Sequence, residues 1–159
     1  MRSLYVATAA ALLLAGCGSV THDTASGKVE TSIAAPPEAV KSALANAMVN
    51  QRYRISKDSQ FEIAFDKPTE NLAAVAFLGS RYDSTPNNRV SFYITPSPPV
   101  TRVVADFAII TNPGSSFERR TDFNNNQDSV QIQSMLDQIK AELEKPAPPP
   151  QSAGPRKKL

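Results

Sequence analysis

Few residues in this chain could carry chemistry. It has one cysteine, Cys17, and one histidine, His22, both near the N-terminus. Nucleophilic catalysis needs a nucleophile beside a base, and a zinc site needs several His, Cys or carboxylate ligands at close spacing. The sequence offers neither pattern, and no glycine-rich phosphate loop follows a predicted strand. We therefore predict no enzymatic activity, no metal and no cofactor.

Asp106 is the carboxylate of most interest, because it lies in an apolar strand candidate. If its side chain points outward, it is solvated. If it points inward, it needs a partner such as Arg89 or Arg102, since burying an unpaired charge is costly. In either case we expect a structural role. Arg119 and Arg120 have acidic neighbours, which is more typical of a mixed surface than of an anion site.

The cysteine ends a segment that is typical of a secretion signal. Arg2 gives it a positive start, and residues 4–15 carry no charge and are rich in Ala and Leu. Signal peptides have about 7–15 apolar residues, whereas a membrane-spanning helix needs about 20. The sequence Leu14-Ala15-Gly16-Cys17 resembles the lipobox of bacterial lipoproteins. The alternative is an ordinary secretory signal in which Cys17 has no role.

The lipobox resemblance implies where the protein is held. In lipoproteins the peptide before the cysteine is removed, here residues 1–16, and the cysteine carries acyl chains such as palmitate. Two or three chains anchor a protein to a membrane without spanning it. Gly18 rather than Asp follows Cys17. By resemblance to the enteric sorting rule, this favours the outer membrane, with the folded part in the periplasm.

Charge and composition narrow the function further. The chain has 17 basic and 15 acidic residues, and removal of a signal that contains only Arg2 leaves a net charge of about +1. Nucleic-acid binding needs a dense basic face, so we expect no nucleic-acid partner. With its one cysteine acylated, the mature chain can form no disulfide and must depend on its hydrophobic core. A segment of roughly 115 residues is long enough for this.

The mature chain divides into three parts. Residues 17–27 are small and polar, which predicts a flexible tether with a solvated His22. Residues 28–145 form a single predicted domain. Residues 146–159 are rich in proline and then basic, which predicts a disordered tail. This tail is either simply solvated or contacts peptidoglycan, anionic lipid or a groove on a partner.

Hydrophobic periodicity places the elements of the domain. In order, it predicts a strand at 28–33, a helix at 37–50, a hairpin of strands at 53–57 and 60–66, strands at 89–95 and 100–111, and a helix at 129–144. Residues 71–78 are predicted as a short helix, with a buried strand as the alternative. Residues 117–122 are either one further strand or an ordered loop.

Local signals refine these boundaries. Alternation places Phe61 on the buried face of its strand, with Ile63 and Phe65. The prolines at 96, 98 and 99 should end the ladder of the strand before them. Asp128 and Gln131 have the spacing of a capping box. The predicted class is α+β, a mainly antiparallel sheet (β-α-β-β-α-β-β-α) with the helices packed on one face.

Residues 33–40, IAAPPEAV, carry a second resemblance. They resemble the entry of helix-grip domains, the START and Bet v 1-like group, in which a strand runs through Ala-Pro into a helix. That resemblance implies a curved sheet covered by a long closing helix. Members of the group often bind apolar ligands between sheet and helix, while some domains of this shape bind only proteins.

Two functions follow from these observations. The first is a non-catalytic protein-interaction module in an envelope assembly or secretion complex; the second is a carrier or sensor of a hydrophobic ligand. The inward residues are large enough to fill a small core, so we predict no enclosed cavity and favour the module. The polar loops at 81–88 and 112–126 then offer the partner surface, namely Arg81, Tyr82, Asp83, Arg119 and Arg120.

Overall fold

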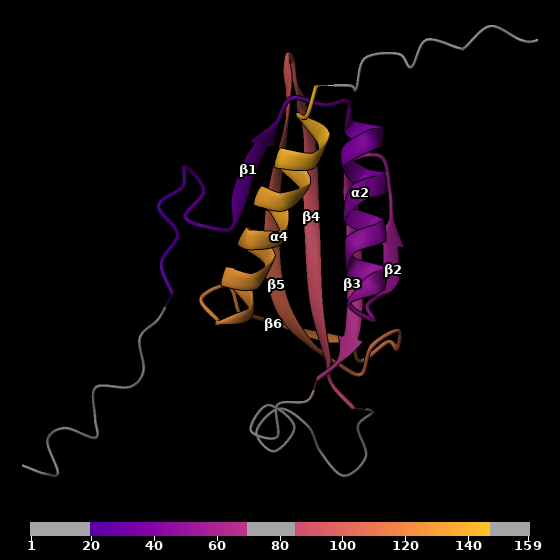
Figure 1. The fold of residues 1–159 in the computed structure, drawn as a ribbon. Coiled ribbons are helices and arrows are strands. Elements are labelled where there is room, and N and C mark those ends of the chain that lie inside the picture. The colour runs from indigo at the N-terminus through magenta and orange to yellow at the C-terminus, as the bar shows by residue number, and fades with distance from the viewer. Residues whose placement is uncertain (1–19, 70–84, 147–159) are drawn as a thin grey trace, which may run out of the picture.

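The computed structural model describes residues 20–69 and 85–146 (Figure 1). Its strands are β1 (Glu30–Ile33), β2 (Arg54–Asp58), β3 (Glu62–Pro68), β4 (Asn87–Ser97), β5 (Val100–Thr111) and β6 (Arg119–Asp122). Its helices are α2 (Pro37–Asn50) and α4 (Asp128–Leu143). The helix predicted at 71–78 lies outside the described residues. The predicted class is confirmed: the domain is an α+β fold with an antiparallel sheet and helices packed against it.

β5 is the strand around which the sheet is built. The sheet has the order β1-β5-β4-β3-β2, and β6 also pairs with β5. β1 pairs with the first half of β5, where Ile33 lies opposite Thr101, and β6 pairs with the second half, where Thr121 lies opposite Ile109. Of the two alternatives for residues 117–122, the structure therefore has the strand.

Both helices lie on the same face of the sheet (Figure 1). Buried hydrophobic side chains of the helices and the sheet pack together in one core cluster. α2 buries Val40, Leu44 and Met48. α4 buries Ser129, Ile132, Met135, Leu136 and Ile139. From the sheet, the rings of Phe65 and Phe92 meet edge to face with centroids 5.9 Å apart, and neither ring is exposed. The core is thus packed where a helix-grip carrier would hold its ligand.

The prediction that Phe61 is buried is wrong. Ile63 and Phe65 are buried as expected, but 54% of Phe61 is exposed. Phe61 precedes the first residue of β3 and lies in the turn from β2, where Ser59 N–H donates to the Glu62 carbonyl. Alternation of faces applies within a strand, so it does not extend to a residue in the adjoining turn.

The prediction that Pro96 ends its strand is also wrong. β4 continues to Ser97, and Pro96 lies opposite Thr101. The N–H of Ile94 points away from β5, because it donates to the Phe61 carbonyl on the β3 side. Pro96 is two residues further and faces the same side, beyond the start of β3. The missing N–H of Pro96 therefore removes no hydrogen bond from the β4–β5 ladder.

The start of α4 differs from the predicted capping box. The helix begins at Asp128 with no side-chain cap from Gln127. Instead, Asn126 Oδ1 accepts the backbone N–H of Ser129 at 2.9 Å, and the Ser129 hydroxyl donates to the Asn126 carbonyl at 2.6 Å. An Asx side chain upstream thus satisfies a free N–H of the first turn. This leaves Asp128 and Gln131 available for another role.

Candidate functional site

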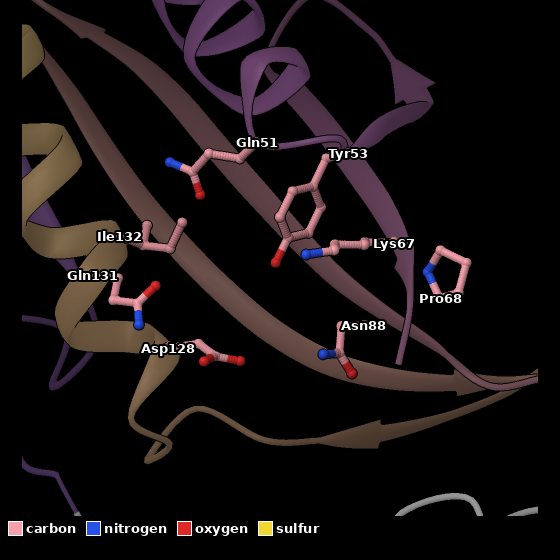
Figure 2. Close-up of a pocket in the computed structure, with 8 residues that line it drawn as sticks. All are labelled: Gln51, Tyr53, Lys67, Pro68, Asn88, Asp128, Gln131 and Ile132. Atoms are coloured by element: carbon pink, nitrogen blue, oxygen red, sulfur yellow. The ribbon is translucent and has the colours of Figure 1, made fainter. Parts of the chain in front are cut away.

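A polar cavity of about 320 Å³ opens where the last turn of α2 and the first turn of α4 meet the sheet (Figure 2). Its lining residues are Gln51, Tyr53, Lys67, Pro68, Asn88, Asp128, Gln131 and Ile132. Figure 2 shows Asp128, Gln131 and Ile132 on α4 facing Tyr53, Lys67 and Asn88 across the opening. The cavity is concave and brings several polar groups together, which is the usual form of a binding site.

Local backbone structure positions the side chains on the α2 side. After α2 ends, Arg52 has φ +67, a conformation that turns the chain sharply. The N–H of Tyr53 then donates to the Met48 carbonyl at 3.1 Å, which fixes the tyrosine just beyond the helix. Lys67 and Asn88 are register partners on β3 and β4. The cavity wall therefore stands on regular elements rather than on a loose loop.

The electrostatics of the cavity keep Tyr53 protonated. Burial raises its pKa, and the negative charge of Asp128 raises it further. The Lys67 ammonium lies 5.7 Å from the centroid of the Tyr53 ring, within the range of a cation–π contact. Tyr53 therefore presents a neutral hydroxyl, and the cavity combines a phenol with an ammonium and a carboxylate.

Several groups in the lining have hydrogen-bonding capacity to spare. Asn88, Asp128 and Gln131 make no direct side-chain hydrogen bond or ion pair with any described residue. An amide side chain offers two donors and an acceptor, and a carboxylate offers only acceptors. Together they suit a peptide-like or hydroxyl-rich group. They do not form a nucleophile with an adjacent base.

A second cavity of about 540 Å³ is an open groove along the two helices. α2 lines it with Ala39, Ser42, Ala43, Asn46, Ala47 and Asn50, and α4 with Met135, Gln138, Ile139, Glu142 and Leu143. The groove is solvent-accessible and has an apolar floor with a polar rim. It differs from a helix-grip pocket, because the helices themselves form it and the sheet does not line it.

The predicted site residues differ in where they lie. Cys17, Arg81, Tyr82 and Asp83 lie outside the described residues. Arg119 is exposed on β6. Arg120 is already engaged by carboxylates of the domain, as the next paragraph describes. Exposed Phe117, which the prediction did not include, lies two residues before Arg119 and is 78% exposed.

The side chain of Asp106 is buried, but its predicted partners are wrong. Its carboxylate is bound by Lys28 Nζ at 2.6 Å and by Arg120 Nη2. Burial alone would raise the pKa of Asp106, but hydrogen bonds from Lys28 and Asn124 and the charge of Arg120 together lower it. Arg120 also binds Asp122 at 3.0 Å. The charge of Asp106 is thus neutralised within the sheet, which supports a structural role.

The two arginines expected near Asp106 bind other carboxylates. Arg89 holds Asp66 at 2.7 Å and Glu118 at 2.9 Å. Arg102 Nε donates to Glu30 at 2.6 Å. Strand register decides these pairings, because Arg89 lies opposite Asp66 across β3 and β4. Ion pairs of this kind occupy the face of the sheet that the helices leave open.

The Glu30–Arg102 pair leads to a prediction for acid stability. Hydrogen bonds from the Arg102 guanidinium and then from the Ser26 side chain lower the pKa of Glu30 from 4.5 to about 2. Because the folded-state pKa is the lower one, ionised Glu30 stabilises the fold above about pH 4.5, and this contribution is lost as the pH falls toward about 2. We expect Glu30→Gln to lose less stability than the wild type between pH 6 and pH 3, as measured by urea unfolding.

Glu38→Gln is the matched control for this experiment. Glu38 is an exposed glutamate in the first turn of α2, and it forms no ion pair with any described residue. Its substitution should leave the acid dependence of the wild type unchanged. Parallel curves for the wild type and Glu30→Gln would instead contradict the stabilising pair.

The prediction of a solvated His22 is wrong. His22 is half-buried, and its Nε2 lies 2.9 Å from Ser129 Oγ at the start of α4. The single hydroxyl proton of Ser129 is already donated to the Asn126 carbonyl. Oγ therefore accepts from His22 Nε2–H. The end of the predicted tether is thus attached to the domain.

No protein-family model matches the chain, and no curated protein does. Among the described residues, no group of three or more His, Cys, Asp or Glu side chains could hold a metal ion. The helices within residues 20–69 and 85–146 are not long and apolar enough to cross a bilayer.

Sequence reasoning missed most of the polar cavity. Tyr53, Lys67, Asn88, Asp128 and Gln131 come from separate segments, so no spacing in the sequence relates them. Asp128 and Gln131 did stand out, but as a helix cap. Only strand register and the docking of α4 bring them to Tyr53.

Proposed function

We propose that this chain is a lipoprotein of the bacterial cell envelope. Acyl chains on Cys17 hold it to the outer membrane, and its α+β domain acts in the periplasm as a non-catalytic module that binds protein within an envelope assembly or secretion complex. The lipobox resemblance of residues 14–17 supports the anchor. The polar cavity supports protein binding.

The observation that best supports a protein-binding module is that the core is filled, whereas a polar cavity opens to solvent. Large buried side chains occupy the space between the sheet and helices, among them Phe65, Phe92 and Leu136. A carrier of hydrophobic ligands needs an apolar space there of about 300–1,000 Å³. The two cavities of such size described above open to solvent instead. We therefore rank the carrier second.

The unpaired groups in the cavity suit a polar segment of a partner. Asn88 and Gln131 can bond peptide N–H and C=O groups, and Asp128 can accept from a donor. The neighbouring groove would add apolar contact through Met135, Ile139 and the small side chains of α2. Apolar contact beside well-placed polar bonds is the common pattern of protein interfaces.

The test is recovery of a partner from cells that make the full chain. After mild cross-linking, the protein is extracted in detergent, and mass spectrometry identifies what is attached. We expect a stoichiometric protein. We also expect the double variant Asn88→Ala, Gln131→Ala to lower its recovery at least about fivefold, since loss of key contacts at an interface costs more than about 1 kcal/mol.

Ser97→Ala is the control for this substitution. Ser97 is exposed at the far end of β4 and lines neither cavity. Both variants should unfold within about 0.5 kcal/mol of the wild type, because surface substitutions rarely do more. Bound lipid in place of protein would favour the carrier. Unchanged recovery of the partner by the double variant would exclude the cavity as its site.

A further inference from the structure

The chain is attached to the domain much closer to Cys17 than a flexible tether would allow. His22 donates from Nε2 to Ser129 Oγ at 2.9 Å, and Ser129 is fully buried at the start of α4. Between His22 and β1, Thr24 Oγ1 donates to the Lys28 carbonyl at 2.6 Å, and Gly27 N–H donates to the Thr24 carbonyl at 3.0 Å. The chain is therefore ordered against the domain from His22 onward.

Chain length then limits how far the domain can stand from the membrane. His22 is five positions after Cys17, and even a fully extended chain spans at most about 3.6 Å per position, so the limit is about 18 Å. The headgroup layer takes up about 6 Å of this on each side of a bilayer. Whatever path the intervening residues take, at most about 12 Å remains between the headgroups and His22.

The end of the domain beside His22 carries exposed apolar side chains. Phe123 is 43% exposed and Val130 45% exposed. The N–H of Phe123 donates to the Phe107 carbonyl at 2.9 Å, which holds this residue at the edge of the sheet after β6. Val130 lies in the first turn of α4, next to Ser129. In Figure 1 the described chain begins beside this same end of α4.

We propose that this end of the domain, with Phe123 and Val130, rests on the lipid surface to which Cys17 is anchored. The inference rests on the proposed lipid attachment. Apolar side chains at a lipid surface gain by entering the headgroup boundary. Asp23 and Asp128 lie at the same end, so attraction to anionic lipid does not drive the contact. Instead, the short connection to Cys17 and the exposed apolar side chains drive the contact with the lipid surface.

Tryptophan fluorescence tests this orientation, because the chain has no tryptophan of its own. Phe123→Trp reports on the proposed contact, and Ser97→Trp reports on the opposite end of the sheet. Ser97 lies opposite Val100, and Val100 is seven residues from Phe107, or about 23 Å along β5 at about 3.3 Å per residue. Each acylated variant is placed in phosphatidylethanolamine–phosphatidylglycerol vesicles whose acyl chains carry bromine, which quenches tryptophan on contact.

We expect quenching at position 123 to be at least about threefold stronger than at position 97, given that separation of about 23 Å. Insertion of twenty Gly and Ser residues after Ser19 should abolish the difference, because the anchor then no longer limits the distance. Equal quenching at both positions without the insertion would overturn the proposal.

A second preparation tests the orientation of the domain even if Cys17 is not acylated in cells. Mass spectrometry of the first preparation shows whether Cys17 carries acyl chains, and their absence would count against the proposed anchor. In that case, the mature chain is joined through its single thiol to a maleimide-bearing phospholipid, and the same fluorescence is measured. Stronger quenching at 123 still supports the orientation, and equal quenching still overturns it.

Discussion

Leu136→Ala is expected to lower the free energy of unfolding of the domain by about 2–5 kcal/mol. Leu136 is fully buried on the face of α4 that packs on the sheet. Truncation of such a leucine removes its transfer free energy and leaves a cavity, and the two costs add. Ile139→Ala should have a similar effect at the lower end of the range, since Ile139 is 5% exposed and borders the open groove.

Gln138→Ala is the matched control, because Gln138 is an exposed residue of the same helix between these two positions. Urea unfolding of each variant gives the comparison. The control should stay within about 0.5 kcal/mol of the wild type. If Leu136→Ala moved the transition no further than the control, α4 would not be packed on the sheet in solution.

The elements with strong periodicity were predictable from the sequence. α2 occupies Pro37–Asn50, as the spacing of Val40, Leu44 and Met48 predicts, and β5 occupies Val100–Thr111. Each of these segments is long enough for its own pattern to decide between helix and strand. β5 also ends at residues that break the pattern, the Asn112-Pro113 step. Local information therefore sufficed for the fold class.

Side-chain pairing was not predictable in the same way. For a buried Asp106 the sequence predicts a partner such as Arg89 on β4 or Arg102 on β5, and for an exposed one only solvent. Its actual partners are Lys28, before β1, and Arg120, on β6. Both reach it because β1 and β6 share one edge of β5. Which strands become neighbours depends on the whole chain, so local periodicity carries no information about it.

Dependence on the whole fold also explains why the predictions for Pro96 and for His22 were wrong. Whether a proline breaks a ladder depends on which neighbour its nitrogen faces, and β3 has no residue paired at that position. Whether a polar segment is flexible depends on what lies near it once the domain has folded. His22 is ordered because Ser129, far away in sequence, presents an acceptor. The low hydrophobicity of residues 18–27 indicated only that they do not build the core.

Cys17→Ser is expected to abolish acylation and to leave the protein either as an uncleaved precursor or in the soluble fraction. The thioether that carries the diacylglyceryl group needs the cysteine sulfur, and serine cannot replace it. Burial of each CH₂ contributes about 0.8 kcal/mol, so the loss of two or three acyl chains removes nearly all of the binding free energy. Fractionation of cells grown with a labelled fatty acid measures both membrane association and acylation.

Ser19→Ala is the control here, since it changes a hydroxyl residue two positions away and leaves the lipobox intact. It should keep full acylation and full membrane association. Because Cys17 precedes the predicted domain at 28–145, we expect Cys17→Ser to leave the urea transition of the soluble protein unchanged. A Cys17→Ser variant that still carried the acyl label and still sedimented with membranes would show that another group holds the anchor. The interpretation of residues 14–17 as a lipobox would then be wrong.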